Sequence, residues 1–294
     1  AALLGMGREA LRRIPSRPDF TLDVEALQRA VEKDRGEGRL PFCVVASAGA
    51  TATGAIDPIG EIADYCARER LWLHVDAAYG GFAALSSSGS ALRAIGRADS
   101  VAIDPHKWLH VPFDCGALIV RDPRALEASF SEVGSYARTD EKGDREGWTF
   151  FEHGPELSRR FRALKVWMLL RHLGCDRVGR MIDHDIGVAR HLAAELEAAP
   201  DMELMAPVPL SVVCFRYRPP GATEEALDAL NRRILKDLQS RAVAYPTHAV
   251  LKGRFALRAC ILNPRTTEKD VETLLAETRA GGHALADGRS GDRS

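Results

Sequence analysis

The first two-thirds of the chain alternates short apolar runs with amphipathic segments, and this alternation constrains the fold more than any other feature. Segments 21–34 and 58–70 place apolar residues at helical spacing, and Pro58 suits the first turn of a helix. The intervening runs are short enough to be buried strands, at 41–46, 71–75, 100–103 and 116–120. Strands separated by helices of this length predict right-handed crossovers and a mainly parallel sheet.

The rest of the chain predicts a smaller set of mixed helices and strands. A long helix is expected over 156–173, with Leu157, Phe161 and Met168 among the residues along one side. Trp167 and Met168 are expected in the core. Further elements are expected at 176–198, 212–217, 223–240, 255–262 and 266–280. We therefore expect an α/β protein with a large domain over 1–173, a small α+β domain over 174–280 and a disordered tail over 281–294.

Composition narrows the functional classes. A net charge of −1 with 46% hydrophobic residues excludes a wholly disordered chain and argues against a nucleic-acid or anionic-membrane partner. No apolar run is long enough to span a membrane, and no secretory signal is visible. The six cysteines are scattered without a C-x-x-C pair, which predicts buried free thiols in the cytoplasm, no disulfide framework and no metal site.

Polar residues that can carry chemistry follow two neighbouring strands. Strand alternation directs His74 and Asp76 to the same face, and Asp104, His106 and Lys107 follow the next strand. Each motif alone is more typical of a polar strand end or a solvated loop. Because the carboxyl ends of parallel strands meet at one edge, the two motifs together indicate a ligand site there.

Lysine usage supports this interpretation. Only seven of the 40 basic residues are lysines, so Lys107 stands out in a chain that otherwise uses arginine. A lysine can lose its proton and act as a nucleophile, which an arginine cannot do. A carboxylate on the adjacent strand, Asp76, would then suit the protonated ring nitrogen of pyridoxal phosphate.

These residues carry a family resemblance. The segments His74-Val75-Asp76-Ala77-Ala78-Tyr79 and Asp104-Pro105-His106-Lys107-Trp108-Leu109 resemble the pyridoxal-phosphate-dependent group II decarboxylases. The resemblance extends from Ala1 to about Glu277 and includes weaker matches at 45–51, 113–115, 159–165, 246–248 and 257–258. It implies a fold-type-I transferase-like architecture of which this chain is the C-terminal portion, with a partial large domain.

The resemblance also implies roles for individual residues. Lys107 would hold pyridoxal 5′-phosphate as a Schiff base, and Asp76 would pair with the pyridine nitrogen. Ala78 would pack against one ring face, Thr51 would lie near cofactor and substrate, and His74 would lie beside the reacting centre.

His106 and Asp104 would lie where the family handles the phosphate. Since a carboxylate repels a phosphate, main-chain contacts are expected at position 104.

The implied activity is a lyase reaction of amino-acid metabolism, the decarboxylation of an L-amino acid, aromatic by analogy, to an amine and CO₂. Tyr136, 29 residues after Lys107 in a loop-like stretch, matches the tyrosine that protonates the substrate Cα; the residues alone suggest only a surface tyrosine. The family forms homodimers with shared active sites. An aldehyde synthase or other lyase on the same scaffold, and a truncated, inactive remnant, remain alternatives.

Overall fold

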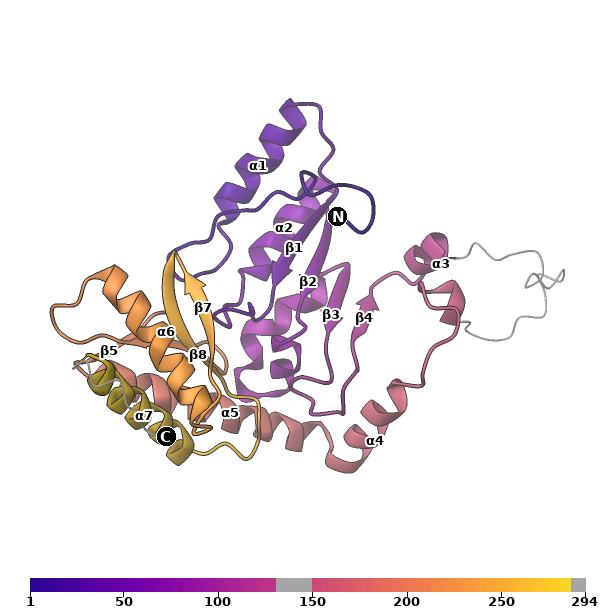
Figure 1. Ribbon diagram of the computed structural model, residues 1–294. Coiled ribbons are helices and arrows are strands. Elements are labelled where there is room, and N and C mark those ends of the chain that lie inside the picture. Colours follow the sequence, from indigo (N-terminus) through magenta and orange to yellow (C-terminus); the bar gives the residue numbers. More distant parts are fainter. Residues whose placement is uncertain (131–149, 287–294) are drawn as a thin grey trace, which may run out of the picture.

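The computed structural model describes residues 1–130 and 150–286, and Figure 1 shows two sheets with helices around them. The N-terminal part comprises α1 (Val24–Gly36), β1 (Cys43–Ser47), α2 (Ile59–Glu69), β2 (Trp72–Asp76), the 3₁₀ segments η1 (Gly80–Leu85) and η2 (Ser87–Arg97), β3 (Ser100–Ile103), β4 (Ala117–Val120), α3 (Arg124–Phe130) and η4 (Phe150–Glu152). After it come α4 (Ala163–Leu173), α5 (Cys175–Ala198), β5 (Met202–Leu204), β6 (Val212–Tyr217), α6 (Glu224–Ser240), β7 (Thr247–Leu251), β8 (Arg254–Cys260) and α7 (Glu268–Ala286).

The first sheet has the order β1-β2-β3-β4. Strands β1, β2 and β3 run parallel, and β4 returns antiparallel to β3. The predicted mainly parallel sheet is therefore confirmed. One face of the sheet is buried, since Ala46 on β1 and Val75 on β2 are wholly inaccessible to solvent. Parallel strands end at the same edge, so the residues after β2 and β3 lie close together.

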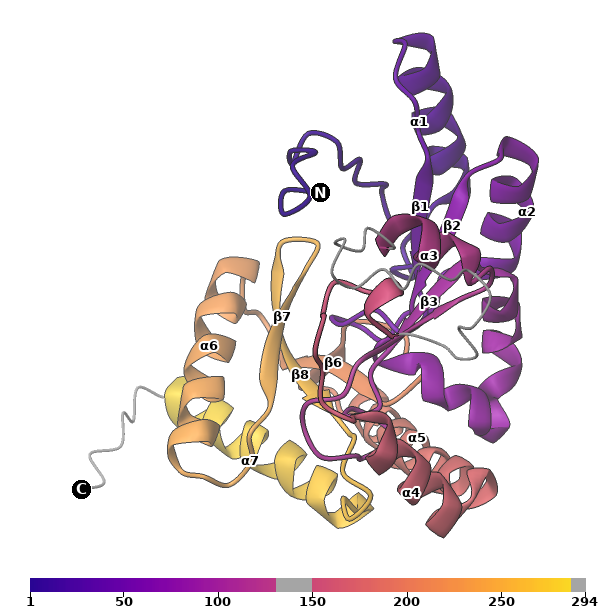
Figure 2. The same ribbon diagram turned by 90° about the vertical axis from the view of Figure 1, so that its right-hand side faces the viewer.

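The second sheet has the order β5-β6-β8-β7 and is antiparallel throughout. All six residues of β6 are buried, because both of its faces are covered. Val213 and Phe215 pack into a core with residues of α5, α6 and α7, whereas Val212 and Cys214 join the core of the N-terminal part. Figures 1 and 2 show α6 and α7 on the side of this sheet that faces away from β1–β4.

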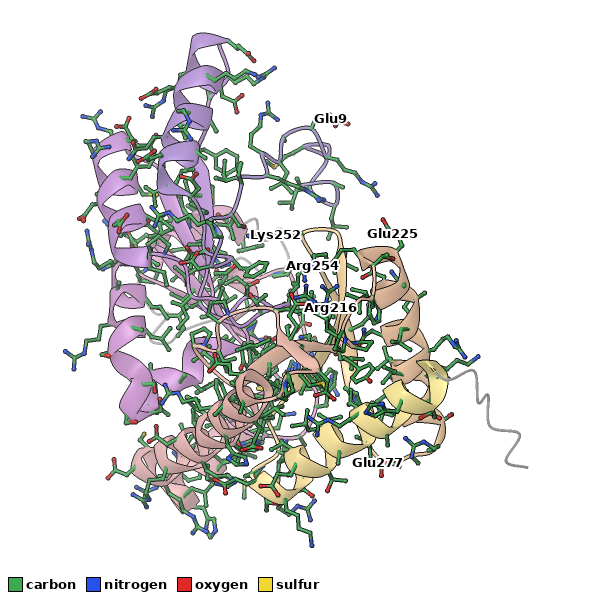
Figure 3. All side chains as sticks on the ribbon, turned by 90° about the vertical axis from the view of Figure 1, so that its left-hand side faces the viewer. Glu9, Arg216, Glu225, Lys252, Arg254 and Glu277 are labelled. Carbon is green, nitrogen blue, oxygen red and sulfur yellow. The ribbon has the colours of Figure 1, made fainter. Side chains whose placement is uncertain are left out.

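A hairpin of the small sheet also contacts the N-terminal segment. Lys252 and Gly253 both have positive φ, 51° and 82°, as the two-residue turn between β7 and β8 requires. Lys252 Nζ donates to the carbonyl of Pro18 at 3.1 Å and lies 4.9 Å from the ring centre of Phe20 (Figure 3). The two parts are thus joined by polar contacts as well as by a shared core.

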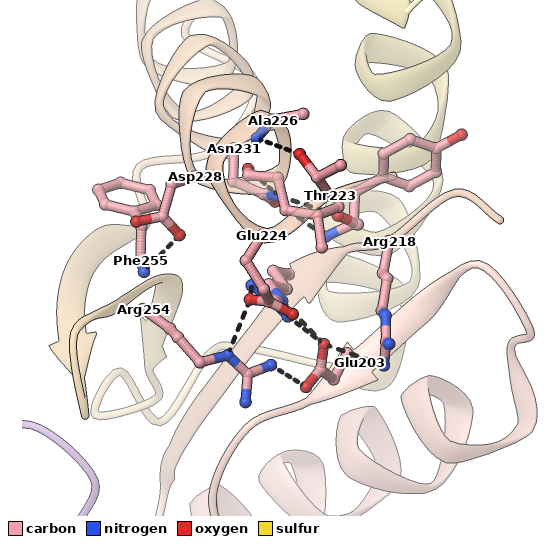
Figure 4. A network of polar contacts seen from close by, with 12 residues as sticks. Glu203, Arg218, Thr223, Glu224, Ala226, Asp228, Asn231, Arg254 and Phe255 are labelled. Carbon is pink, nitrogen blue, oxygen red and sulfur yellow. Dashed lines mark hydrogen bonds and ion pairs between the residues drawn. The ribbon is translucent and has the colours of Figure 1, made fainter. Parts of the chain in front are cut away.

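A buried arginine on β6 forms ion pairs with glutamates on β5 and α6. Arg216 on β6 is inaccessible to solvent; its Nε donates to Glu203 on β5 at 2.8 Å, and its two terminal nitrogens donate to Glu224 on α6 at 2.8 and 2.9 Å. Arg254 on β8 contacts the same two glutamates (Figure 4). Glu224 therefore meets two guanidinium groups, and Glu203 meets three because Arg218 also lies 3.6 Å from it. These ion pairs offset the cost of burying the Arg216 charge.

The helix expected over 156–173 differs from the structure. Helix α4 begins only at Ala163, because the preceding residues are held by ion pairs instead: Arg160 Nη2 lies 2.6 Å from Asp114 Oδ1. The expectation that Trp167 and Met168 belong to the core is wrong, since they are 60% and 56% exposed. Helical spacing of apolar residues predicts an apolar stripe but not what covers it.

The C-terminal helix is longer than expected. It was expected to end at 280, yet α7 continues to Ala286, so the first six residues of the expected tail are helical and the others lie outside the described residues. The pair Gly281-Gly282 resembles a helix end in sequence. In the structure Gly282 has a packing role, because a Cβ there would lie 2.4 Å from the ring of Tyr217.

The cysteines are free thiols, but not all are buried as expected. Cys66, Cys115 and Cys214 are buried, whereas Cys175 is exposed because it begins α5 at the surface.

Candidate active site

The end of β2 presents two polar side chains as the alternation predicts. Leu73 and Val75 are buried, whereas His74 is half-buried and Asp76 is exposed on the other side of the strand. Asp76 Oδ1 accepts a hydrogen bond from the backbone N–H of Ala78 at 3.1 Å. The turn that follows β2 thereby orients the carboxylate through Oδ1, and Oδ2 remains available to a ligand.

The segment with Lys107 lies directly beside this turn. Strand β3 pairs with β2 in a register that places Ala102 opposite Asp76, and the backbone N–H of Asp104 donates to Ala78 O at 3.3 Å. The Lys107 N–H then donates to Asp104 O at 2.9 Å, which closes a tight turn. The structure therefore brings the predicted amine and carboxylate to one edge of the sheet.

Lys107 has a charged neighbour that the sequence did not predict. Its Nζ lies 2.8 Å from Asp104 Oδ2, and His106 Nε2 lies 3.9 Å from the same oxygen. The Asp104 carboxylate therefore forms an ion pair with Lys107. A phosphate was expected to contact the main chain at position 104. The Asp104 N–H is already used in the structure, because it donates to Ala78 O.

His106 holds the far side of the loop. Its Nδ1 lies 2.6 Å from Cys115 O and 3.0 Å from Cys115 N, and its ring packs against Phe113 with centres 4.4 Å apart. Both polar groups of the Cys115 backbone therefore face Nδ1, and the Cys115 N–H is a donor to it. His106 thus fixes the path of the loop that carries Lys107.

His74 is hydrogen-bonded to a serine on the neighbouring strand β3. Its Nδ1 lies 2.8 Å from Ser100 Oγ, which also accepts a hydrogen bond from Trp72 Nε1 at 2.8 Å. With the indole as donor, the serine proton is free to be donated to Nδ1, which leaves the imidazole proton on Nε2. Burial lowers the pKa of His74, so its neutral form is favoured.

Thr51 and Ala78 lie on adjoining loops. Thr51 is exposed in the turn after β1, which the Gly54 N–H closes by donating to Ala50 O at 2.7 Å. Gly49, at the start of this turn, has φ +103°, and a Cβ on it would lie 3.0 Å from the backbone nitrogen of Gly80. The Thr51 loop is therefore packed against the segment that follows Ala78. Tyr136 lies outside the described residues.

One residue that holds the Lys107 loop was not predicted from the sequence. Lys165 on α4 donates through Nζ to Pro112 O at 2.6 Å and to Asp114 O at 2.7 Å. Lys165 is one of only seven lysines, which could have drawn attention to it. Its partners are backbone carbonyls, however, and these cannot be identified from residue types.

A cavity of about 620 Å³ lies elsewhere, between residues 10–16, α1 and β1. Its lining includes Ile14, Phe20 and Leu27 and none of the predicted site residues, so it is not the candidate active site. Within residues 1–130 and 150–286, no group of three metal-ligating side chains is found. No helix in the same residues is long and apolar enough to cross a bilayer.

The chain is similar to known decarboxylases. The pyridoxal-dependent decarboxylase conserved domain matches residues 1–218. An aromatic-L-amino-acid decarboxylase from Bacillus atrophaeus is 38% identical over 95% of this chain and 58% of that protein. An L-2,4-diaminobutyrate decarboxylase from Rhizobium meliloti is 34% identical over 94% of this chain and 55% of that protein.

The fold is also similar to those of solved structures of related enzymes. The Oryza sativa TDC structure with PLP and tryptamine has a TM-score of 0.90 and 32% identity, over 97% of this chain and 59% of that chain. A Rhodiola rosea 4-hydroxyphenylacetaldehyde synthase has a TM-score of 0.83 and 28% identity. This chain therefore spans little more than half the length of the relatives that it matches.

Proposed function

Because this chain belongs to the pyridoxal-dependent decarboxylase family, we propose that it forms part of an enzyme that converts an L-amino acid to an amine and CO₂. The observation that carries the proposal is the pairing of β2 with β3, which brings Asp76 and Lys107 to one sheet edge. An aromatic amino acid is the proposed substrate, because the relatives include decarboxylases of aromatic amino acids and of tryptophan. Diaminobutyrate and histidine are the alternatives that other relatives supply.

The residues at this edge fit pyridoxal phosphate. The cofactor needs an amine that bonds its aldehyde carbon and an acid that faces its ring nitrogen. The chain offers a half-exposed Lys107 and an exposed Asp76 on neighbouring segments. Ala78 and Thr51 would border the ring, and His106 would lie toward the phosphate, whereas the Asp104 N–H is already bonded to Ala78 O. When bound, the cofactor supplies a ring that accepts the electron pair released as CO₂ leaves.

The chain's own groups would hold charge and protons around that ring. Asp76 would stabilise a proton on the ring nitrogen through a charge-assisted hydrogen bond. Lys107 would supply the amine nitrogen, and Asp104 Oδ2, which lies 2.8 Å from Nζ, would accept a hydrogen bond from it. A neutral His74, with its proton on Nε2, would donate a hydrogen bond without adding positive charge.

Tyr136 is proposed as the group that returns a proton to the substrate Cα. An aldehyde synthase is the second candidate function, favoured by the similarity to the Rhodiola rosea enzyme. The two reactions differ in product, since a decarboxylase releases an amine and a synthase an aldehyde. The choice between them therefore depends on product analysis.

We also propose that the complete enzyme is a homodimer with shared active sites, in the cytoplasm. Exposed apolar side chains support a partner: Trp167 and Met168 on α4, and Leu118 and Ile119 on β4, are more than half exposed. Sedimentation of the full-length protein would test this, and a monomer at micromolar concentration would contradict it.

Cofactor binding provides the direct test of the proposed function. Titration of the purified chain with pyridoxal phosphate should produce the visible absorbance of a lysine-bound pyridoxal, and Lys107→Ala should abolish it. Lys236→Ala, a matched change at an exposed lysine of α6, should leave the band unchanged. A band that survives in Lys107→Ala would refute the assignment of the amine.

Asp76→Ala tests the opposite end of the ring. It should weaken decarboxylation by about tenfold to a hundredfold in the full-length enzyme, because a hydrogen bond to a charged group contributes roughly 1.5–3 kcal/mol. Wild-type turnover in this variant would show that Asp76 does not support the ring nitrogen.

A further inference from the structure

The residues that follow the two proposed cofactor contacts enter one buried cluster. Trp108 comes directly after Lys107, and Tyr79 comes directly after Ala78. The rings of Trp108 and Tyr79 are stacked, with centres 5.0 Å apart and planes at 12°. Trp108 is inaccessible to solvent and Tyr79 nearly so. The Lys107 segment and the Ala78 segment are therefore packed against each other behind the site.

The far ends of both rings are bonded to residues from the C-terminal part. Trp108 Nε1 donates to Asp185 Oδ2 on α5 at 2.8 Å. The Tyr79 hydroxyl lies 2.8 Å from Ser211 Oγ and accepts from the Ser211 N–H at 2.9 Å, just before β6. Asp185 and Ser211 are themselves inaccessible to solvent. Each cofactor-bearing segment is thus attached by one aromatic residue to the small domain.

Packing alone does not account for a carboxylate at position 185. Among the described residues, its Oδ1 has no hydrogen-bond partner, so the buried group makes a single side-chain bond, to Trp108. A buried carboxyl with one partner lowers the stability of the fold, because its desolvation is only partly repaid. What the group does provide is a directional acceptor that sets the depth and orientation of the indole.

We propose that Asp185 and Ser211 are positioning residues, which act through Trp108 and Tyr79 to fix the segments that carry Lys107 and Ala78. Asp185 sets the position of the Lys107 turn, and Ser211 sets the turn after Asp76. Neither residue needs to touch cofactor or substrate. The role in cofactor binding rests on the proposed function, whereas the ordering of the Lys107 turn does not.

Three variants of α5 test the role of Asp185. Asp185→Leu removes the acceptor, and Asp185→Asn retains a carbonyl oxygen for the indole N–H. Asp183→Leu is the matched control on the same helix, because Asp183 accepts from Ser87 Oγ at 2.7 Å in η2, a contact outside this cluster. Thermal unfolding ranks the three variants by stability, so that local effects are separated from general destabilisation.

The first readout needs no cofactor. The backbone N–H groups of His106, Lys107 and Val111 bond to carbonyls within the turn at 2.9–3.3 Å, and their hydrogen exchange reports how well it is ordered. Exchange of peptides covering 104–116 should be at least about tenfold faster in Asp185→Leu than in wild type, and near wild type in Asp185→Asn and Asp183→Leu. Equal exchange in Asp185→Leu and Asp183→Leu would overturn the proposal.

The second readout is the affinity for pyridoxal phosphate, from the absorbance of the lysine-bound cofactor. Asp185→Leu should weaken it by at least about tenfold, while Asp185→Asn stays within about threefold of wild type. An Asp185→Asn variant as weak as Asp185→Leu would overturn the role of the hydrogen bond. If the turn loosens as expected but wild type shows no Lys107-dependent band, the proposed function fails and the positioning role stands.

Discussion

The buried carboxyl of Asp185 should leave a measurable signature in the pH dependence of stability. Burial raises the pKa of Asp185 from 3.8 to about 6, although the Trp108 hydrogen bond works in the opposite direction. Between these pH values the folded protein binds more protons than the unfolded chain. Stability therefore falls as pH rises through this window and becomes constant above it.

The magnitude follows from the two pKa values. The fully ionised group costs roughly 3 kcal/mol of folding free energy at neutral pH relative to its protonated form. Between pH 7 and pH 4.5, most of the unfolded population stays ionised while the folded form becomes protonated. Asp185 should therefore add about 2 kcal/mol to stability on going from pH 7 to pH 4.5.

Asp185→Asn removes this titration, so the comparison isolates it. Urea unfolding of both proteins at pH 7 and pH 4.5 gives four free energies of unfolding. The advantage of Asp185→Asn over wild type should be about 2 kcal/mol larger at pH 7 than at pH 4.5. Carboxylates that salt bridges stabilise, such as Asp201 beside Arg279, affect both proteins equally. Parallel pH profiles of the two proteins would show that Asp185 does not titrate with a raised pKa in the folded state.

Two further changes test the packing of the C-terminal part of the chain. Removing the buried guanidinium by Arg216→Ala should cost about 3 kcal/mol in urea unfolding, because it removes the buried cation that bonds both glutamates and leaves them only the part-exposed Arg254 in common; a cost below about 1 kcal/mol would contradict this. Gly282→Ala should destabilise by about 1–3 kcal/mol, since its Cβ would lie 2.4 Å from the Tyr217 ring. The same change at Gly187 should instead stabilise α5 by about 0.5–1 kcal/mol, because no heavy atom beyond its own stretch of helix lies within 4 Å of the added Cβ.

The site's location could be predicted from the sequence because it depends on local rules. Because side chains alternate along a strand, His74 and Asp76 share a face. Because β2 and β3 are parallel, Lys107, which follows β3, lies at the same sheet edge as Asp76. Both rules operate within a few residues of each motif. The strand bounds at 100–103 and 212–217 match the structure for the same reason.

Long-range partners could not be predicted. Trp108 and Asp185 are 77 residues apart, and Tyr79 and Ser211 are 132 apart, so no spacing rule connects them. Bonds to backbone carbonyls, such as those of Lys165, leave no trace in residue identity. The apolar stripe of α4 was visible in sequence, but periodicity does not say whether the core or another surface covers it.

Chemical trapping tests the central claim that Lys107 is the residue that binds the cofactor. Borohydride reduction of the chain loaded with pyridoxal phosphate makes the lysine linkage permanent, and mass spectrometry of the peptides then locates it among the seven lysines. We expect one equivalent of phosphopyridoxyl group on Lys107, with none on Lys165 or Lys252. Label spread over the surface lysines, with Lys107 unmodified, would contradict the account.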